Sequence, residues 1–272
     1  MKAKQIIGCV FWMTSLALSF SSGRANAALV FGEPTNLGPP ASAIAAGEFG
    51  PTISGDGLSI YFNSGRAGGL GNGDLWISTR PTLSDPWGPA ANLGPDLNTE
   101  GGDGTPSIAS DGLSLFFSSD HRPTVGLRAG DEDLWMTTRA TIDSPWAVPV
   151  NVGAPVNSVN YERGADISAD GLSLYFVRGF AESPVPRNSL DIYVSTRSTV
   201  ADPWGEPVVL GPNVNSAHYE SDPSMSADGL TLFFASEQGE VLGGADIFVS
   251  RRESTSDRWG PAVNLGPGVN TP

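Results

Sequence analysis

The strongest constraint on the fold is a repeat of 55–59 residues that occurs four times along the chain. The tripeptide Asp-Gly-Leu marks each copy and begins at Asp56, Asp111, Asp170 and Asp228. Two further landmarks keep the same spacing, an Asp-(Leu/Ile)-aromatic motif and an aromatic residue followed by Gly or Ala. Self-similarity at a period of this size is typical of solenoids, propellers and arrays, in which each copy buries its apolar face against the next.

Each copy divides into four short strands, A to D, and contains no helical apolar period. Asp-Gly between two strand-like runs predicts a tight hairpin, because Gly adopts positive φ and Asp tolerates it. In the fourth copy these two runs are residues 223–226, strand A, and residues 230–234, strand B. In the first copy, strand C is expected at residues 75–80 and strand D at residues 89–94. Four antiparallel strands per copy predict an all-β fold, a β-propeller of four tandem four-stranded blades.

The repeat motifs also resemble those of a known family. Ser-x-Asp-Gly-Leu-(Ser/Thr)-(Leu/Ile)-(Tyr/Phe)-Phe, followed by Asp-(Leu/Ile)-aromatic, is similar to the WD40-like repeats of TolB-type β-propeller proteins. The resemblance covers nearly all of residues 31–272. It implies a periplasmic or extracellular propeller, commonly a binding or scaffolding module, and it carries no particular enzyme activity, because such repeats occur in proteins of many functions.

The N-terminus reads as a secretory leader. A positive start at Lys2 and Lys4 precedes an apolar run over residues 6–20 and the small-x-small sequence that ends at Ala27. The run is too short for a membrane anchor, which needs about 20 apolar residues. We therefore predict a signal peptide at 1–27, a secreted or periplasmic location, and one propeller domain at 28–272. Its repeats are approximately 31–86, 87–145, 146–203 and 204–258, with a partial copy at 259–272.

Composition excludes several kinds of site and partner. Cleavage after Ala27 would remove Cys9, the only cysteine, so the mature chain would have no disulfide, thiolate metal site or Cys nucleophile. It would also change the formal net charge from −14 to −17, because Lys2, Lys4 and Arg24 leave with the leader. Such a charge disfavours nucleic acid and anionic lipid. We expect no stable membrane span in the mature chain.

The ends of the repeat array leave two ring designs open. The first landmark, at Phe31-Gly32, is a strand D with no A, B or C before it, while the fourth copy already has a strand D after Trp259. Either the ring is a closed four-bladed one with a spare N-terminal outer strand, or the design is five-bladed and lacks one A–B–C segment. We favour the incomplete five-bladed ring, since a borrowed outer strand is a common way to close a propeller.

Four acids form a candidate ligand- or cation-binding ring: Glu48, Asp103, Glu162 and Glu220. Each lies three residues before the Pro or Ala of its strand A, so we expect all four on one face near the central channel. Converging carboxylates repel each other, which raises some pKa values or recruits a cation such as Ca²⁺. The alternative is that each acid caps a local turn.

Aromatic residues beside two of these acids suggest sugar contacts. Tyr161 and Tyr219, with His218, precede the acids of the third and fourth copies. The repeated Trp residues, by contrast, are expected to pack between blades, and the repeated Asp before strand C to accept backbone hydrogen bonds. The Arg at the end of each strand C is expected to pair with such an acid across blades.

Two functions remain open on this evidence. The first is an exported, non-catalytic binding or scaffold module that recognises a glycan or an envelope or extracellular protein through one loop-rich face, with no cofactor beyond a possible Ca²⁺. The alternative is a glycoside hydrolase or lyase that uses carboxylates near the channel. We favour the module, because catalytic acids and bases need different environments and the four acids occupy equivalent positions.

Overall fold

The computed structural model describes residues 31, 32, 34–38, 47–122, 132–179 and 190–271. The predicted signal peptide, residues 1–27, lies outside this range. Within it the chain forms β-strands and turns, and no helix is long and apolar enough to cross a membrane.

Four sheets of four antiparallel strands make up the described chain. The first blade contains β1 (Glu48–Ile53), β2 (Ser59–Ser64), β3 (Asp74–Thr79) and β4 (Ala91–Asn92). The second contains β5 (Asp103–Ile108), β6 (Ser114–Ser119), β7 (Asp133–Thr138) and β8 (Val150–Asn151). The third contains β9 (Tyr161–Ile167), β10 (Ser173–Gly179), β11 (Asp191–Thr196) and β12 (Val208–Val209). The fourth contains β13 (Glu220–Met225), β14 (Thr231–Ser236), β15 (Asp246–Arg251) and β16 (Val263–Asn264).

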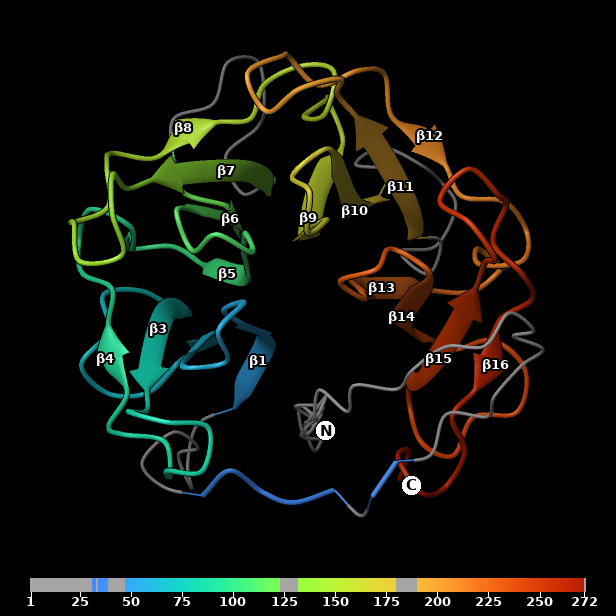
Figure 1. Cartoon of the computed structure of the whole chain (residues 1–272), viewed down its shortest axis with the longest axis horizontal. Coiled ribbons are helices and arrows are strands. Elements are labelled where there is room, and N and C mark those ends of the chain that lie inside the picture. The colour runs from blue at the N-terminus through green and yellow to red at the C-terminus, as the bar shows by residue number, and fades with distance from the viewer. Residues whose placement is uncertain (1–30, 33, 39–46, 123–131, 180–189, 272) are drawn as a thin grey trace.

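The blades stand around a central channel, as predicted for a propeller (Figure 1). The first strand of each sheet is innermost, and β1, β5, β9 and β13 follow one another around the channel. No fifth sheet of described residues lies in the interval between the fourth and the first blade, and residues 31, 32 and 34–38 run between these two blades (Figure 1). The described residues of this segment pair with none of the four sheets, although the sequence pattern marks them as an outer strand.

The Asp-Gly turns form as the sequence predicts. In the first blade the Asp56 carboxylate accepts hydrogen bonds from the Ser54 hydroxyl (2.6 Å) and the Leu58 backbone N–H (2.9 Å). Gly57 follows with a φ of 72°, in the left-handed region that favours glycine. The same arrangement recurs at Asp170 and Asp228, so these repeated acids hold turns.

A repeated asparagine, which sequence reasoning missed, clamps strand C. The Asn98 side chain accepts from the Leu75 N–H (2.7 Å) and donates to the Leu75 carbonyl (3.1 Å), beyond the two-residue strand β4. Its equivalents make the same pair of bonds in the other blades: Asn157, Asn215 and Asn270. Asp74, at the start of strand C, accepts from loop N–H groups, which confirms the role predicted for that acid.

Aromatic side chains fill the spaces between blades, which confirms the packing predicted for the Trp residues. The ring of Trp259 meets that of Tyr175, in the preceding blade, edge to face at a centroid distance of 6.4 Å. Trp146 with Tyr61 and Trp204 with Phe116 repeat this geometry. The cores are therefore shared by neighbouring blades, and each blade is stabilised by the next.

The predicted pairing of the strand C arginines with acids across blades is wrong. The Arg80 guanidinium donates to the Gly57 carbonyl (3.0 Å) and lies over the Trp87 ring, with its central carbon 4.4 Å from the ring centroid. Arg139, Arg197 and Arg252 do the same in their blades. Because a planar guanidinium both stacks on an aromatic ring and donates in its plane, it joins the Asp-Gly turn to the Trp of its own blade.

Candidate functional site

Each of the four predicted ring acids contacts its own blade. Glu48 binds Arg66 (2.9 Å), and Asp103 accepts from the Thr99 N–H and hydroxyl. Glu162 and Glu220 bind the serine four residues earlier in the same way, and Glu162 also pairs with Arg178 (2.8 Å). Three of the four side chains are buried, the exception being Glu48. This arrangement is the turn-capping alternative, and the residues lie in the first two positions of strand A rather than preceding it.

The fourth acid lacks the cation that its equivalents have. Glu48, Asp103 and Glu162 each lie within 4 Å of an arginine nitrogen, whereas no described arginine pairs with Glu220. The side-chain N–H₂ of Gln238, on the loop after β14, is buried without a partner among the described residues. Burial raises the pKa of Glu220, while its hydrogen bonds from Ser216 and Ser236 act in the opposite direction. No group of three His, Cys, Asp or Glu side chains in the described ranges could hold a metal ion, and Ca²⁺ stays a prediction.

A left-handed residue recurs two positions after each of these acids, where a β-bulge interrupts the pairing of strands A and B. The positions are Gly50, Thr105, Gly164 and Asp222, with φ between 45° and 61°. Thr and Asp are strained in this region of φ, Thr most of all because it is β-branched. Backbone strain of this kind concentrates at functional sites, which directs attention to the inner strands of the second and fourth blades.

A polar cluster joins three blades beside these bulges. Arg163, on β9, donates to the Tyr219 hydroxyl (2.8 Å), and its other terminal nitrogen lies 3.9 Å from the Glu132 carboxyl. Glu132 precedes β7 in the second blade, and Asp222 lies on β13 of the fourth. The side chains of Arg163 and Glu132 are each about a third exposed (34% and 33%), and Asp222 is exposed. The cluster is therefore open to a ligand.

The two carboxyls of this cluster have different surroundings. Burial raises the pKa of Glu132, and the negative charges of Asp120 and Asp222 raise it further, while Arg163 lowers it. One oxygen of Glu132 is buried with no hydrogen bond among the described residues. Two carboxyls whose surroundings differ in this way, one with a raised pKa and one exposed, are the kind of pair from which acid–base catalysis is built. Sequence reasoning identified Tyr219 here but missed Glu132, Arg163 and Asp222.

The other two predicted aromatic contacts have surroundings of their own. Tyr161 is half-buried and packs against the core shared by the third and fourth blades. His218 is exposed, and its backbone N–H donates to the Ser216 hydroxyl (3.0 Å). The differences between copies could have revealed the missed residues. Glu132, Arg163 and Asp222 are charged, whereas the residues at the equivalent positions of the other blades are uncharged.

A second unusual acid lies further along the same inner strand. Asp166 accepts from the Met225 N–H (2.7 Å) in the fourth blade, and the Ser107 hydroxyl of the second blade approaches it at 3.4 Å. Burial raises the pKa of Asp166 to about 7, against the effect of these hydrogen bonds. The acid thus joins three inner strands at a point where its charge is poorly solvated.

We expect Asp166→Asn to flatten the pH dependence of stability. The pKa of this carboxyl is near 4 in the unfolded chain and about 7 in the folded one. At a pH below 4 the protonated carboxyl therefore contributes fully to the stability of the fold, and this contribution is lost as the pH rises through 7. Asn keeps an acceptor for Met225, so the variant should be about 1–2 kcal/mol more stable at pH 8 and nearly unchanged at pH 4. Urea unfolding at both pH values measures this. Equal losses at both values would contradict it.

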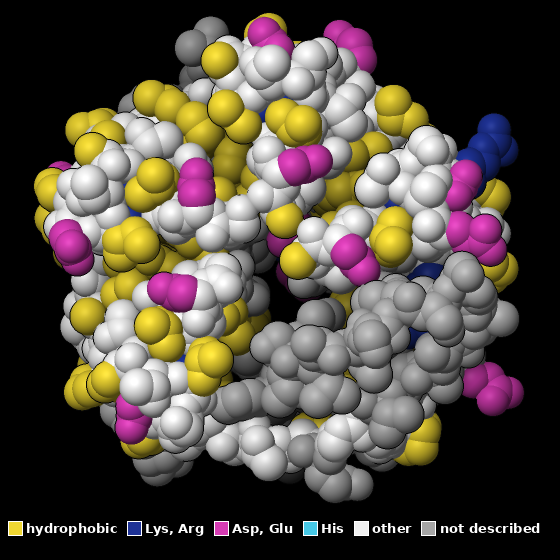
Figure 2. Space-filling view, in the orientation of Figure 1, with side chains coloured by type: hydrophobic (Ala, Val, Ile, Leu, Met, Phe, Trp, Pro, Cys, Tyr) yellow, Lys and Arg dark blue, Asp and Glu magenta, His cyan; other side chains and the backbone are white. Residues whose placement is uncertain are grey.

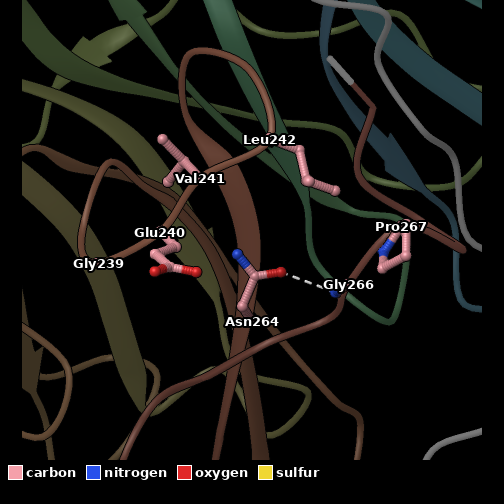
Figure 3. A pocket seen from close by; sticks show the side chains of 7 residues that line it. All are labelled: Gly239, Glu240, Val241, Leu242, Asn264, Gly266 and Pro267. Carbon is pink, nitrogen blue, oxygen red and sulfur yellow. Dashed lines mark hydrogen bonds between the residues drawn. The ribbon is translucent and has the colours of Figure 1, made fainter.

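A hollow of about 660 Å³ lies at the edge of the fourth blade and is lined by none of the residues of the polar cluster. Figure 3 shows that Glu240, Val241 and Leu242, on the loop before β15, border it together with Asn264 and Pro267. The Asn264 side chain is fully engaged, since it accepts from the N–H of Gly266 (2.7 Å) and donates to Asp246 (2.8 Å). The hollow therefore presents mainly apolar surface.

The acidic character of the chain is visible on its surface. Figure 2 shows carboxylate side chains spread over the blades of one face, with few Lys or Arg side chains among them and an opening at the centre. The formal net charge of −14 is thus distributed and does not form one acidic patch on this face. Dispersed charge of one sign favours solubility.

No protein-family model matches the sequence, and a search of curated proteins gave no match. Among solved structures, the chain is similar to TolB from Acinetobacter baumannii, with a TM-score of 0.50, 15% identity, and coverage of 80% of this chain and 43% of that one. It is also similar to an α-L-arabinofuranosidase from Lactobacillus brevis, with a TM-score of 0.52, 14% identity, and coverage of 80% and 72%. A third is the catalytic domain of a Coprinopsis cinerea GH62 α-L-arabinofuranosidase, with a TM-score of 0.53, 13% identity, and coverage of 86% and 74%.

These neighbours support the TolB-like resemblance at the level of the fold, and they correct the functional expectation. Solved structures with this fold include α-L-arabinofuranosidases, which contradicts our preference for a non-catalytic module. The symmetry argument behind that preference also fails, because Glu132, Arg163 and Asp222 occupy non-equivalent positions of the repeat. At these identities the likeness shows the fold alone: the chain is a β-propeller of the kind found in TolB and in α-L-arabinofuranosidases.

Proposed function

We propose that the protein is an exported glycoside hydrolase whose active site is the cluster of Glu132, Arg163, Tyr219 and Asp222. The observation that carries the proposal is the pair of unlike carboxyls, with Glu132 half-buried and raised in pKa and Asp222 exposed beside it. Glycosidases use two carboxyl groups in this way, one as an acid and the other as a base or nucleophile. The fold is compatible, since structural neighbours include α-L-arabinofuranosidases.

Each residue then has a role in cleaving the glycosidic bond. Glu132 gives its proton to the bridging oxygen as the bond from that oxygen to the anomeric carbon breaks. Asp222 takes a proton from the water that attacks the anomeric carbon, so the products are a free sugar and an alcohol. Arg163 is a positioning residue, because it holds the Tyr219 hydroxyl and lies beside Glu132. The Tyr219 ring offers a face for the apolar side of a sugar.

A hydrolysis screen tests the proposal. The exported protein is incubated with a panel of chromogenic glycosides, including an α-L-arabinofuranoside, and with plant and animal polysaccharides, and sugar release is measured by chromatography. We expect turnover of one class of glycoside, and its loss in the double variant Glu132→Gln/Asp222→Asn with an unchanged circular dichroism spectrum. Release of no sugar from any substrate, or equal activity in the double variant, would overturn the proposal.

A further inference from the structure

Neighbouring inner strands are joined by a repeated hydrogen bond that has no counterpart on the fourth blade. A side chain in strand A accepts the backbone N–H of the next strand A. The pairs are Thr52 with Ile108 (3.5 Å), Ser107 with Ile167 (3.1 Å) and Asp166 with Met225 (2.7 Å). Ser224 holds the equivalent position in the fourth blade, where it is exposed and accepts no such bond from a described residue. The inter-blade acceptor position of the fourth blade is therefore without a donor among the described residues.

A second repeated bond follows the same rule. The carbonyl that precedes strand C accepts from the N–H of the acid that opens the next strand A. The pairs are Gly73 with Asp103 (2.8 Å), Glu132 with Glu162 (2.8 Å) and Leu190 with Glu220 (3.0 Å). Ala245 is the equivalent residue of the fourth blade, and no described N–H donates to its carbonyl in this way. The open side of the fourth blade thus repeats two features of an occupied blade interface.

Phe31 and Leu37 already make contacts of the kind that an outer strand D makes in the other blades. The Phe31 ring meets that of Phe233 edge to face at 6.3 Å, the geometry of the Trp residues that follow the other blades. At the other end, Leu37 packs on the core cluster of the first blade, as Leu93 packs on the cluster shared by the first and second. The segment therefore contacts both neighbours of a fifth position.

We propose that the interval is a docking surface for one further A–B–C unit of this repeat, joined in tandem like the other four, with residues 31–38 as its outer strand. Continuity with the three established interfaces identifies the occupant. Strand A of the added unit would supply the N–H groups that hydrogen bond to the Ser224 side chain and the Ala245 carbonyl. Strand B of the added unit would supply an apolar ring that packs against Trp87. A helix satisfies its own N–H groups internally, so it cannot replace this strand.

An extended protein tests this. A copy of residues 46–86 is added after Pro272, which places its acid four residues after Thr271, as Asp103 follows Thr99. We expect the melting temperature to rise by at least about 5 °C and the added segment to resist limited proteolysis. Phe31→Ala should lower the melting temperature more in the extended protein than in the original one, because the new unit needs its outer strand.

The matched control is the same extension with Tyr61→Asp and Leu75→Asp in the added copy only. These changes remove the apolar face without altering length, so the melting temperature should stay at that of the original protein. An unmodified extension that is cleaved by protease and leaves the melting temperature unchanged would overturn the proposal. Glycoside hydrolysis is not part of this readout, so the outcome is independent of the proposed activity.

Discussion

Replacement of Glu132 by Gln is expected to lower kcat/KM about 10²–10⁴-fold on a glycoside with a poor leaving group. Gln keeps the size and polarity of the side chain but has no proton to give to the departing oxygen. A substrate with an acidic nitrophenol as its leaving group needs no such proton, so the variant should retain most of its activity there. Steady-state kinetics on the two substrates measure the difference.

The pH profile gives this prediction a second readout. Because burial and nearby negative charge raise the pKa of Glu132, the acid should stay protonated to a higher pH than an ordinary glutamate, and activity should fall as the pH passes that pKa. Asp120→Asn is the matched control. It removes one of the charges that raise the pKa but keeps an acceptor for the Gly102 N–H. The basic limb should move to lower pH. Equal loss of activity on both substrates would contradict the acid role.

Trp259→Ala should be the most destabilising single change considered, at about 3–5 kcal/mol of the free energy of unfolding. The ring is 7% exposed, meets Tyr175 of the preceding blade and lies under the Arg252 guanidinium. Its loss opens a cavity in the core shared by the third and fourth blades and removes the stacking partner of a cation. Urea-induced unfolding measures the change.

Val263→Ala, four residues away, is the control for that measurement. The Val263 side chain is 59% exposed on β16, so truncation there should cost less than about 0.5 kcal/mol. Similar values for the two variants would show that the fourth blade does not depend on its contact with the third. A large difference is expected because the fourth blade shares its core with the third, whereas its other side meets residues 31–38.

The fold was predictable because its determinants are local and repeated. Asp56 and Gly57 specify a turn within a few residues, and the Trp residues return at the period at which a packing surface must return. The strand C arginines were not assigned correctly, because Arg80 binds a carbonyl and a ring that the sequence does not mark as partners. The short outer strands and the asparagine clamp likewise depend on three-dimensional spacing.

The candidate site was less accessible to sequence reasoning, for a physical reason. Repetition directs attention to equivalent positions, whereas the cluster combines residues at different positions of three blades. Arg163 reaches Tyr219 in the next blade, and Glu132 comes from the blade before. The bulge that turns Asp222 into the left-handed region is invisible in composition. The acids that repetition did indicate, such as Glu162, serve local turns and ion pairs.

The asparagine clamp has a consequence for how these molecules meet one another. Unpaired backbone groups on an outer strand are templates on which another chain can add a strand and begin to aggregate. Here strand D is only two residues long, and just beyond it Asn98 occupies both backbone groups of Leu75. The rim of each blade therefore offers a foreign strand almost no ladder to extend, so sheets made of short strands can face solvent all around the molecule without joining edge to edge.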